Sequence, residues 1–212
     1  GGIGNNGRMW LIESTVDAND GDGIGGIMNF GTLEVVRTSI SSNSAGYGSG
    51  GGITNIGTLT MIQSLVAKNV SEGSSTGGGI ENLDRGHVTL INTTVSENTI
   101  AQGGGGIENM GTITVTNSTI YGNHSQYTFH GFNGIANSGT VRMSNTILAN
   151  NDFGNCSGTI ISLGNNLSSD NTCTPSADGD LYNTDPKLAP LADNGGSTLT
   201  HALLSGSPAI DS

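Results

Sequence analysis

The chain has 212 residues, the ordinary size of one domain, with 33% hydrophobic and 4% aromatic residues. Its 36 glycines are more than twice the usual share of about 7%. Six Lys and Arg against 17 Asp and Glu give a formal net charge of −11, which argues against nucleic acid and anionic membranes as partners, and no apolar run is long enough for membrane insertion by this segment.

A repeated unit begins at the first residue and recurs six times. Each unit opens with a Gly-Ile step, and successive isoleucines are 24 to 28 residues apart: Ile3, Ile27, Ile53, Ile80, Ile107 and Ile135. A fixed period of this length is typical of solenoids. Because the chain starts inside a repeat and shows no signal peptide, we expect it to be a piece of a longer protein.

Within each unit, a second glycine, followed by Thr in four of the six units, precedes a segment in which apolar residues recur at every second position. In residues 112–116, Ile113 and Val115 share one face and the threonines share the other. The same register predicts inward pairs in the other units: Leu33/Val35, Leu59/Met61, Val88/Leu90 and Val141/Met143. With the Gly-Ile step and a later Ser-Thr-Ile step, each unit is expected to hold three short strands.

Two polar columns accompany the strands. An apolar residue is followed three positions later by Asn in every unit: Val16/Asn19, Ile40/Asn43, Val66/Asn69, Val95/Asn98, Ile120/Asn123 and Ile147/Asn150. Asn tolerates the left-handed conformation that a corner requires, and stacked Asn side chains can bond to one another as a ladder. A second polar ladder is expected at Ser14, Thr38, Ser64, Thr93, Ser118 and Asn145.

These patterns predict an all-β fold, a right-handed parallel β-helix of about six to seven coils. Residues 1–155 form the repeats, and residues 156–212 form the last coil and a C-terminal cap. Stacking coils at about 4.8 Å buries the apolar face that a single coil would expose. A leucine-rich horseshoe has a similar period, but its Leu-x-x-Leu-x-Leu motif is absent.

The connections of variable length fall at one phase of the coil, at 20–25, 44–51, 70–78 and 124–133. Insertions gathered on one face of a repeat protein often mark its binding face. The last of these connections carries aromatic residues in a chain that has few, which predicts a ligand or partner contact at Tyr127, Phe129, His130 and Phe132. Packing of this loop on itself is the alternative.

Two acidic groups are candidates for chemistry or metal binding. Glu81 and Glu108 occupy the position after Ile in adjacent coils, whereas the flanking coils carry Thr54 and Ala136. Two carboxylates this close raise a pKa or recruit a cation. A catalytic or calcium site is one interpretation, and two exposed strand residues that share a cation or bind none are the other. Asp17, Asp20 and Asp22 form a carboxylate-rich loop that resembles a calcium loop without the glutamate of an EF-hand. A solvated loop is the alternative there; calcium is the only cofactor these patterns suggest.

Cys156 and Cys173 are the only cysteines, and no metal-ligand spacing surrounds them. A disulfide is the first interpretation, and it implies an oxidising, extracellular location. Two free buried thiols are the alternative.

Residues 50–66 resemble the repeats of bacterial polymorphic-outer-membrane-protein-like β-helices. The tail, with Asp185-Pro186 and the segments 190–196, 200–203 and 206–211, resembles the C-terminal signature of choice-of-anchor Q domain proteins, as do residues 156–159 and Cys173. The resemblance implies a secreted or cell-surface protein in which the tail, including a structural His201, caps the helix. It carries no catalytic signature onto this chain.

The sequence thus favours a non-enzymatic extracellular or cell-surface scaffold that assembles end to end into a filament or matrix. Its expected partners are further copies of itself, other cell-surface proteins or glycans. The second hypothesis is an adhesin or glycan-binding module that uses the one-sided loops. The third is a polysaccharide lyase or glycoside hydrolase that uses Glu81 and Glu108.

Overall fold

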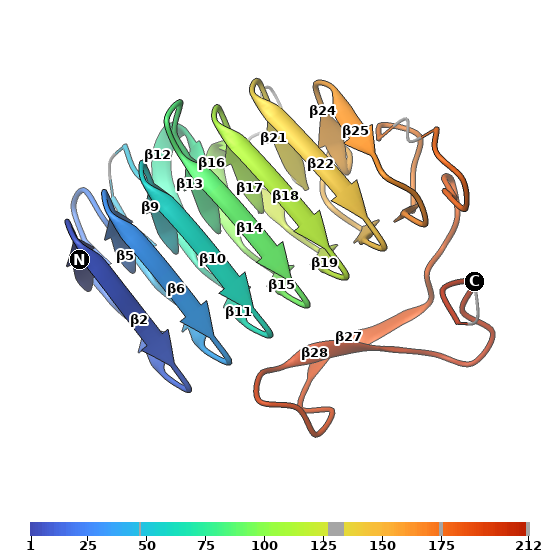
Figure 1. The fold of residues 1–212 in the computed structure, drawn as a ribbon, viewed down its shortest axis with the longest axis horizontal. Helices are drawn as coiled ribbons and strands as arrows, with labels where there is room; N and C mark the ends of the chain where they lie inside the picture. Colours follow the sequence, from blue (N-terminus) through green and yellow to red (C-terminus); the bar gives the residue numbers. More distant parts are fainter. Residues whose placement is uncertain (47, 127–133, 174–175, 211–212) are drawn as a thin grey trace.

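The structure is a computed structural model that describes residues 1–46, 48–126, 134–173 and 176–210. These residues contain strands and no helix, so none of them provides a helical membrane span. The strands form a parallel β-helix in which successive coils stack along one axis (Figure 1). The predicted fold class is confirmed.

Four parallel sheets build the solenoid. Sheet A contains β1 (Ile3–Asn5), β5 (Ile27–Asn29), β9 (Ile53–Asn55), β13 (Ile80–Asn82), β17 (Ile107–Asn109), β21 (Ile135–Asn137) and β24 (Cys156–Ser157). Sheet B contains β2 (Arg8–Ile12), β6 (Thr32–Val36), β10 (Thr58–Ile62), β14 (His87–Ile91), β18 (Thr112–Thr116), β22 (Thr140–Ser144) and β25 (Ile160–Ser162). Sheet C contains β3 (Thr15–Asp17), β7 (Ser39–Ser41), β11 (Leu65–Ala67), β15 (Thr94–Ser96), β19 (Thr119–Tyr121), β23 (Ile147–Ala149) and β26 (Leu167–Ser168).

Sheet D was not foreseen, because its strands lie in the connections of variable length. It contains β4 (Asp20–Gly21), β8 (Ser44–Ala45), β12 (Val70–Gly77), β16 (Thr99–Gly104) and β20 (His124–Ser125). Five coils therefore have four strands rather than the expected three, and within the described residues two further coils have strands in sheets A, B and C only. The predicted number of six to seven coils is thus slightly higher than the five coils that have a strand in all four sheets.

The core consists of stacked columns of inward side chains from sheets A, B and C. Every inward pair expected in sheet B is at most 2% exposed, and the isoleucines of the Gly-Ile step from Ile27 to Ile135 are fully buried. Each coil places its apolar residues above those of the coil before, because the strands pair in register.

The sixth coil corrects two of the predicted columns by one residue. Leu148, not Ile147, is the fully buried partner of Ile120 in register, and Asn151, not Asn150, accepts the ladder bond of Asn123. Likewise buried Thr146, rather than exposed Asn145, continues the Ser/Thr column. In each coil the column residue directly follows a residue with positive φ. In the sixth coil these preceding residues, Asn145 and Asn150, are themselves asparagines, so both columns were assigned one position too early.

The left-handed residues themselves stand one position before the expected asparagines. They form two corner columns with positive φ in nearly every coil: Glu13, Arg37, Gln63, Asn92, Asn117, Asn145 and Asn165 between sheets B and C, and Ala18, Ser42, Lys68, Glu97, Gly122 and Asn150 between sheets C and D. The next residue then turns inward, where its side chain bonds to the neighbouring coil. The ladder asparagines are therefore not the left-handed residues, whereas Asn150, which was expected in the ladder, is left-handed.

Two asparagine ladders run through the stack. The predicted one links Asn19, Asn43, Asn69, Asn98, Asn123 and Asn151 through side-chain amide bonds of 2.8–3.0 Å. A second ladder closes sheet A at Asn5, Asn29, Asn55, Asn82, Asn109 and Asn137, with bonds of 2.7–2.8 Å. These bonds satisfy polar groups that would otherwise be buried without partners.

The C-terminal region has two parts instead of one cap. Residues 170–173 and 176–181 cover the last coil: Leu181 pairs with Leu167 of β26, and Cys173 forms the predicted disulfide with Cys156 of β24. The remainder forms an antiparallel hairpin of β27 (Leu188–Ala192) and β28 (Thr200–Leu203), which turns back along the side of the solenoid (Figure 1). Most of the segment that carries the family resemblance therefore covers a side and not the end.

Candidate functional site

Glu81 and Glu108 lie next to each other on the outer face of sheet A. β13 and β17 pair with Glu81 opposite Glu108, and the next residues in register are Thr54 and Ala136. The predicted register is confirmed, and the acidic array ends at two residues.

The expectation that these two glutamates are exposed is wrong. Glu81 is only 4% exposed, and Glu108 is partly buried. Both carboxylates accept hydrogen bonds from the glycine-rich backbone that leads into sheet A: Glu81 Oε2 from the Gly50 N–H at 3.1 Å, and Glu108 Oε2 from the Gly104 N–H at 2.9 Å. A side chain at Gly104 would collide with the carbonyl group of Ile107, so only glycine lets this backbone fold so closely over the sheet.

Burial raises the pKa of both carboxyl groups. For Glu108 desolvation is the largest cause, the bond from Gly104 opposes it, the charge of Glu81 adds to it, and the pKa rises to about 7. For Glu81 desolvation again raises the pKa, and the bonds from the Thr54 hydroxyl and Gly50 oppose it. Both carboxyl groups therefore keep their protons to a higher pH than an exposed glutamate does.

Carboxylate chemistry on a polysaccharide needs contact with the substrate, and the coverage of Glu81 leaves little of its carboxylate accessible. For metal binding, no three His, Cys, Asp or Glu side chains of the described part of the chain lie close enough to hold an ion together. Glu81 and Glu108 thus form a pair without a third acidic neighbour.

Asp17, Asp20 and Asp22 are all exposed along the first coil. Asp17 accepts a hydrogen bond from the Ser41 hydroxyl of the next coil at 2.7 Å. The three carboxylates are not among any group placed to share an ion within the described residues.

Tyr127, Phe129, His130 and Phe132 lie outside the described residues, so their predicted contact with a ligand or partner stays a prediction. At the start of the same connection, His124 lies 3.1 Å from the Asp152 carboxylate.

His201 holds the hairpin against sheet C. It is 9% exposed, with Nδ1 2.8 Å from the Ala189 carbonyl oxygen and Nε2 2.8 Å from the Ser96 hydroxyl. Outward residues of the central strands are buried here, namely Leu65, Ala67, Thr94 and Ser96, whereas Thr15 and Asp17 of β3 are exposed. The sequence signal for this docking was the apolar pair Leu65 and Ala67 at outward positions, where the repeat pattern otherwise favours polar residues.

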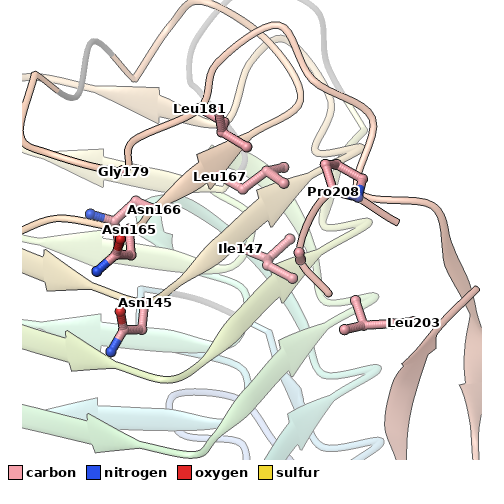
Figure 2. Close-up of a pocket in the computed structure, with 10 residues that line it drawn as sticks. Asn145, Ile147, Asn165, Asn166, Leu167, Gly179, Leu181, Leu203 and Pro208 are labelled. Atoms are coloured by element: carbon pink, nitrogen blue, oxygen red, sulfur yellow. The ribbon is translucent and has the colours of Figure 1, made fainter. Parts of the chain in front are cut away.

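A groove runs between the tail hairpin and the corner at which sheets B and C meet. The sequence did not predict it. It consists of two adjoining cavities of about 260 and 270 Å³, which share Asn145, Ile147 and Leu203. Figure 2 shows the cavity nearer the end of the solenoid, with the Asn145 and Asn165 amides on one side and Ile147, Leu203 and Pro208 on the other. We refer to both cavities together as the tail groove.

The fold and these sites define a disulfide-bonded parallel β-helix with a laterally docked hairpin. Comparisons with family models, with curated proteins and with solved structures found no match. The resemblance to choice-of-anchor Q domain proteins and to polymorphic-outer-membrane-protein-like repeats therefore stays a prediction.

Proposed function

We propose that this chain is an extracellular or cell-surface scaffold domain, a rigid rod that does no chemistry of its own. The observation that carries the proposal is the continuous ladder system: two files of buried asparagines tie every coil from the first to the sixth to its neighbour. Such ladders resist bending and local opening, because each opened coil would leave buried amides without partners.

The disulfide supports the proposed extracellular location. Cys156 and Cys173 are both 1% exposed and join the last coil to the segment that covers it. Disulfides persist in oxidising compartments, which favours a secreted or surface-exposed protein.

The end-to-end filament receives less support than the isolated rod. Residues 170–173 and 176–181 lie over the last coil and bond to its backbone groups. For example, the Ser168 N–H donates to the Leu181 carbonyl, and the Leu181 N–H donates to the Asn166 carbonyl. A second copy would have to displace this segment in order to add strands at that end.

Negative-stain microscopy of the unheated protein, with and without a calcium chelator, tests the assembly. Separate rods in both conditions are the expected result, whereas chelator-sensitive filaments would require acidic groups that bridge copies through calcium. An assay for sugars released from a panel of polysaccharides tests whether the protein has enzymatic activity. Cleavage that disappears in Glu108→Gln would overturn the scaffold proposal in favour of an enzyme.

A further inference from the structure

One wall of the tail groove consists of asparagine residues from three successive coils. Asn117, Asn145 and Asn165 stand at the left-handed corner between sheets B and C, one per coil, so their side chains repeat at the coil spacing of about 4.8 Å. All three are exposed, and their side-chain amides make no hydrogen bond within the described part of the chain. The groove thus presents a row of available donors and acceptors.

The same corner changes character along the rod. In the first two coils it carries Glu13 and Arg37, which form an ion pair at 2.8 Å. From Asn92 onward every residue of the column is asparagine, and three of these line the groove. The amide row therefore coincides with the stretch that the C-terminal segment flanks.

The opposite wall is apolar. Ile147, Leu203 and Pro208 lie on the other side of the cavity from the asparagines in Figure 2, and Leu203 is 40% exposed. Among the residues that the structure describes, no Asp, Glu, Lys or Arg lines either cavity. A charged ligand would lose its hydration here without gaining an opposite charge.

The backbone of this corner is already occupied. The N–H groups of Asn117, Asn145 and Asn165 donate to the carbonyl groups of Ser144, Gly164 and Asp178. A peptide that binds by strand addition needs free backbone groups, so the corner offers it little. A sugar ring, in contrast, presents hydroxyl groups for amides together with apolar C–H surface for aliphatic side chains.

From this arrangement we propose that the tail groove binds a neutral oligosaccharide chain along the rod axis, with its hydroxyl groups on the asparagine row and its C–H faces on Leu203 and Ile147. The site is separate from the scaffold role, since a rigid rod needs no ligand. A failure to bind sugar would therefore leave the scaffold proposal intact.

The test is a titration of the ¹⁵N-labelled protein with cello-, malto-, manno- and N-acetylglucosamine oligosaccharides, followed by NMR. Shifts of the Asn117, Asn145 and Asn165 side-chain amides with one member of the panel are the expected result. Asn145→Gly removes the amide while it keeps the left-handed backbone accessible, and it should weaken binding at least about tenfold.

Asn92→Gly is the matched control, because Asn92 is an exposed left-handed asparagine of the same corner column that does not line the groove. It should leave the affinity unchanged. The proposal is overturned if no neutral oligosaccharide shifts these amides, if Asn145→Gly binds as tightly as the parent, or if only an acidic glycan or a peptide binds.

Discussion

The imidazole ring of His201 packs against the ring of Tyr121, with centroids 4.3 Å apart, and this contact joins the tail hairpin to the fifth coil. The Ala189 carbonyl group can only accept a hydrogen bond, so Nδ1 of His201 carries a proton. The Ser96 hydroxyl lies 2.8 Å from Nε2 and 2.9 Å from the Tyr121 carbonyl oxygen, and it has one proton for these two acceptors. Isolated two-stranded hairpins are marginal in water, so docking depends on contacts of this kind.

Acidification is expected to loosen the hairpin. Burial lowers the pKa of His201 below 6.5, while the bond to Ala189 and the charge of Glu97 oppose that effect. Glu97 in turn lies 3.8 Å from Lys68. Because the folded pKa is the lower one, the stabilisation is complete above about pH 6.5 and is lost as the pH falls through the folded value. Hydrogen-exchange protection of residues 188–203, corrected for the intrinsic rate, should decrease from about pH 7 to about pH 5.

The His201→Phe variant keeps a ring against Tyr121 but cannot take up a proton. Its hairpin should be less protected than the parent's at neutral pH and should show no step on acidification. Protection of the parent that is independent of pH would contradict this role for His201.

Glu108→Gln should stabilise the protein at alkaline pH. The folded pKa of Glu108 is raised to about 7 from 4.5, so stability is lost as the pH rises through this interval. With allowance for partial exposure, we expect a gain of about 1–2 kcal/mol at about pH 8 and almost none at about pH 4. Urea denaturation at both values measures it.

Glu34→Gln on the outer face of sheet B is the control for the general loss of one negative charge. It should change the stability by less than about 0.5 kcal/mol at either pH. Equal effects of the two substitutions would mean that burial of Glu108 has no energetic consequence.

The interior of the asparagine ladder should matter more than its end. Asn82 is fully buried, accepts from Asn55 and donates to Asn109, so Asn82→Ala leaves polar groups unpaired on both sides. We expect a loss of about 2–4 kcal/mol for it and a smaller loss for Asn5→Ala, whose side chain has one ladder neighbour. Equilibrium unfolding of the two variants decides, and equal losses would contradict the ladder as a source of rigidity.

The left-handed corners predict a stabilising substitution. Ala18 is exposed with φ +54, a conformation that costs L-residues other than glycine, asparagine and aspartate about 1–2 kcal/mol. Ala18→Gly should therefore raise the free energy of unfolding by up to about 1 kcal/mol, after the greater entropy of glycine in the unfolded chain is subtracted.

Ala67→Gly is the comparison, since Ala67 lies buried in β11. It should destabilise, and thermal unfolding of the pair checks the opposite signs. If Ala18→Gly also destabilises, the corner carries no strain that glycine relieves.

The sequence by itself determined the β-helix, the Glu81–Glu108 register and the inward columns, except that of sheet C in the sixth coil. Each of these follows from a period, and a period is local information repeated in every coil. The disulfide was one of two open interpretations, because nothing near Cys156 in sequence says where Cys173 lies in space.

Only the tertiary structure decided the burial of Glu81, the fourth sheet and the course of the tail. Glu81 looks exposed in a strand pattern, and the glycine-rich backbone that covers it comes from other parts of its own and neighbouring coils. The tail motif occurs once, so no repeat could place it. Its position depends on contacts between distant residues such as His201 and Ser96, and these form only when the stacked coils present an outward patch that is complementary to the hairpin.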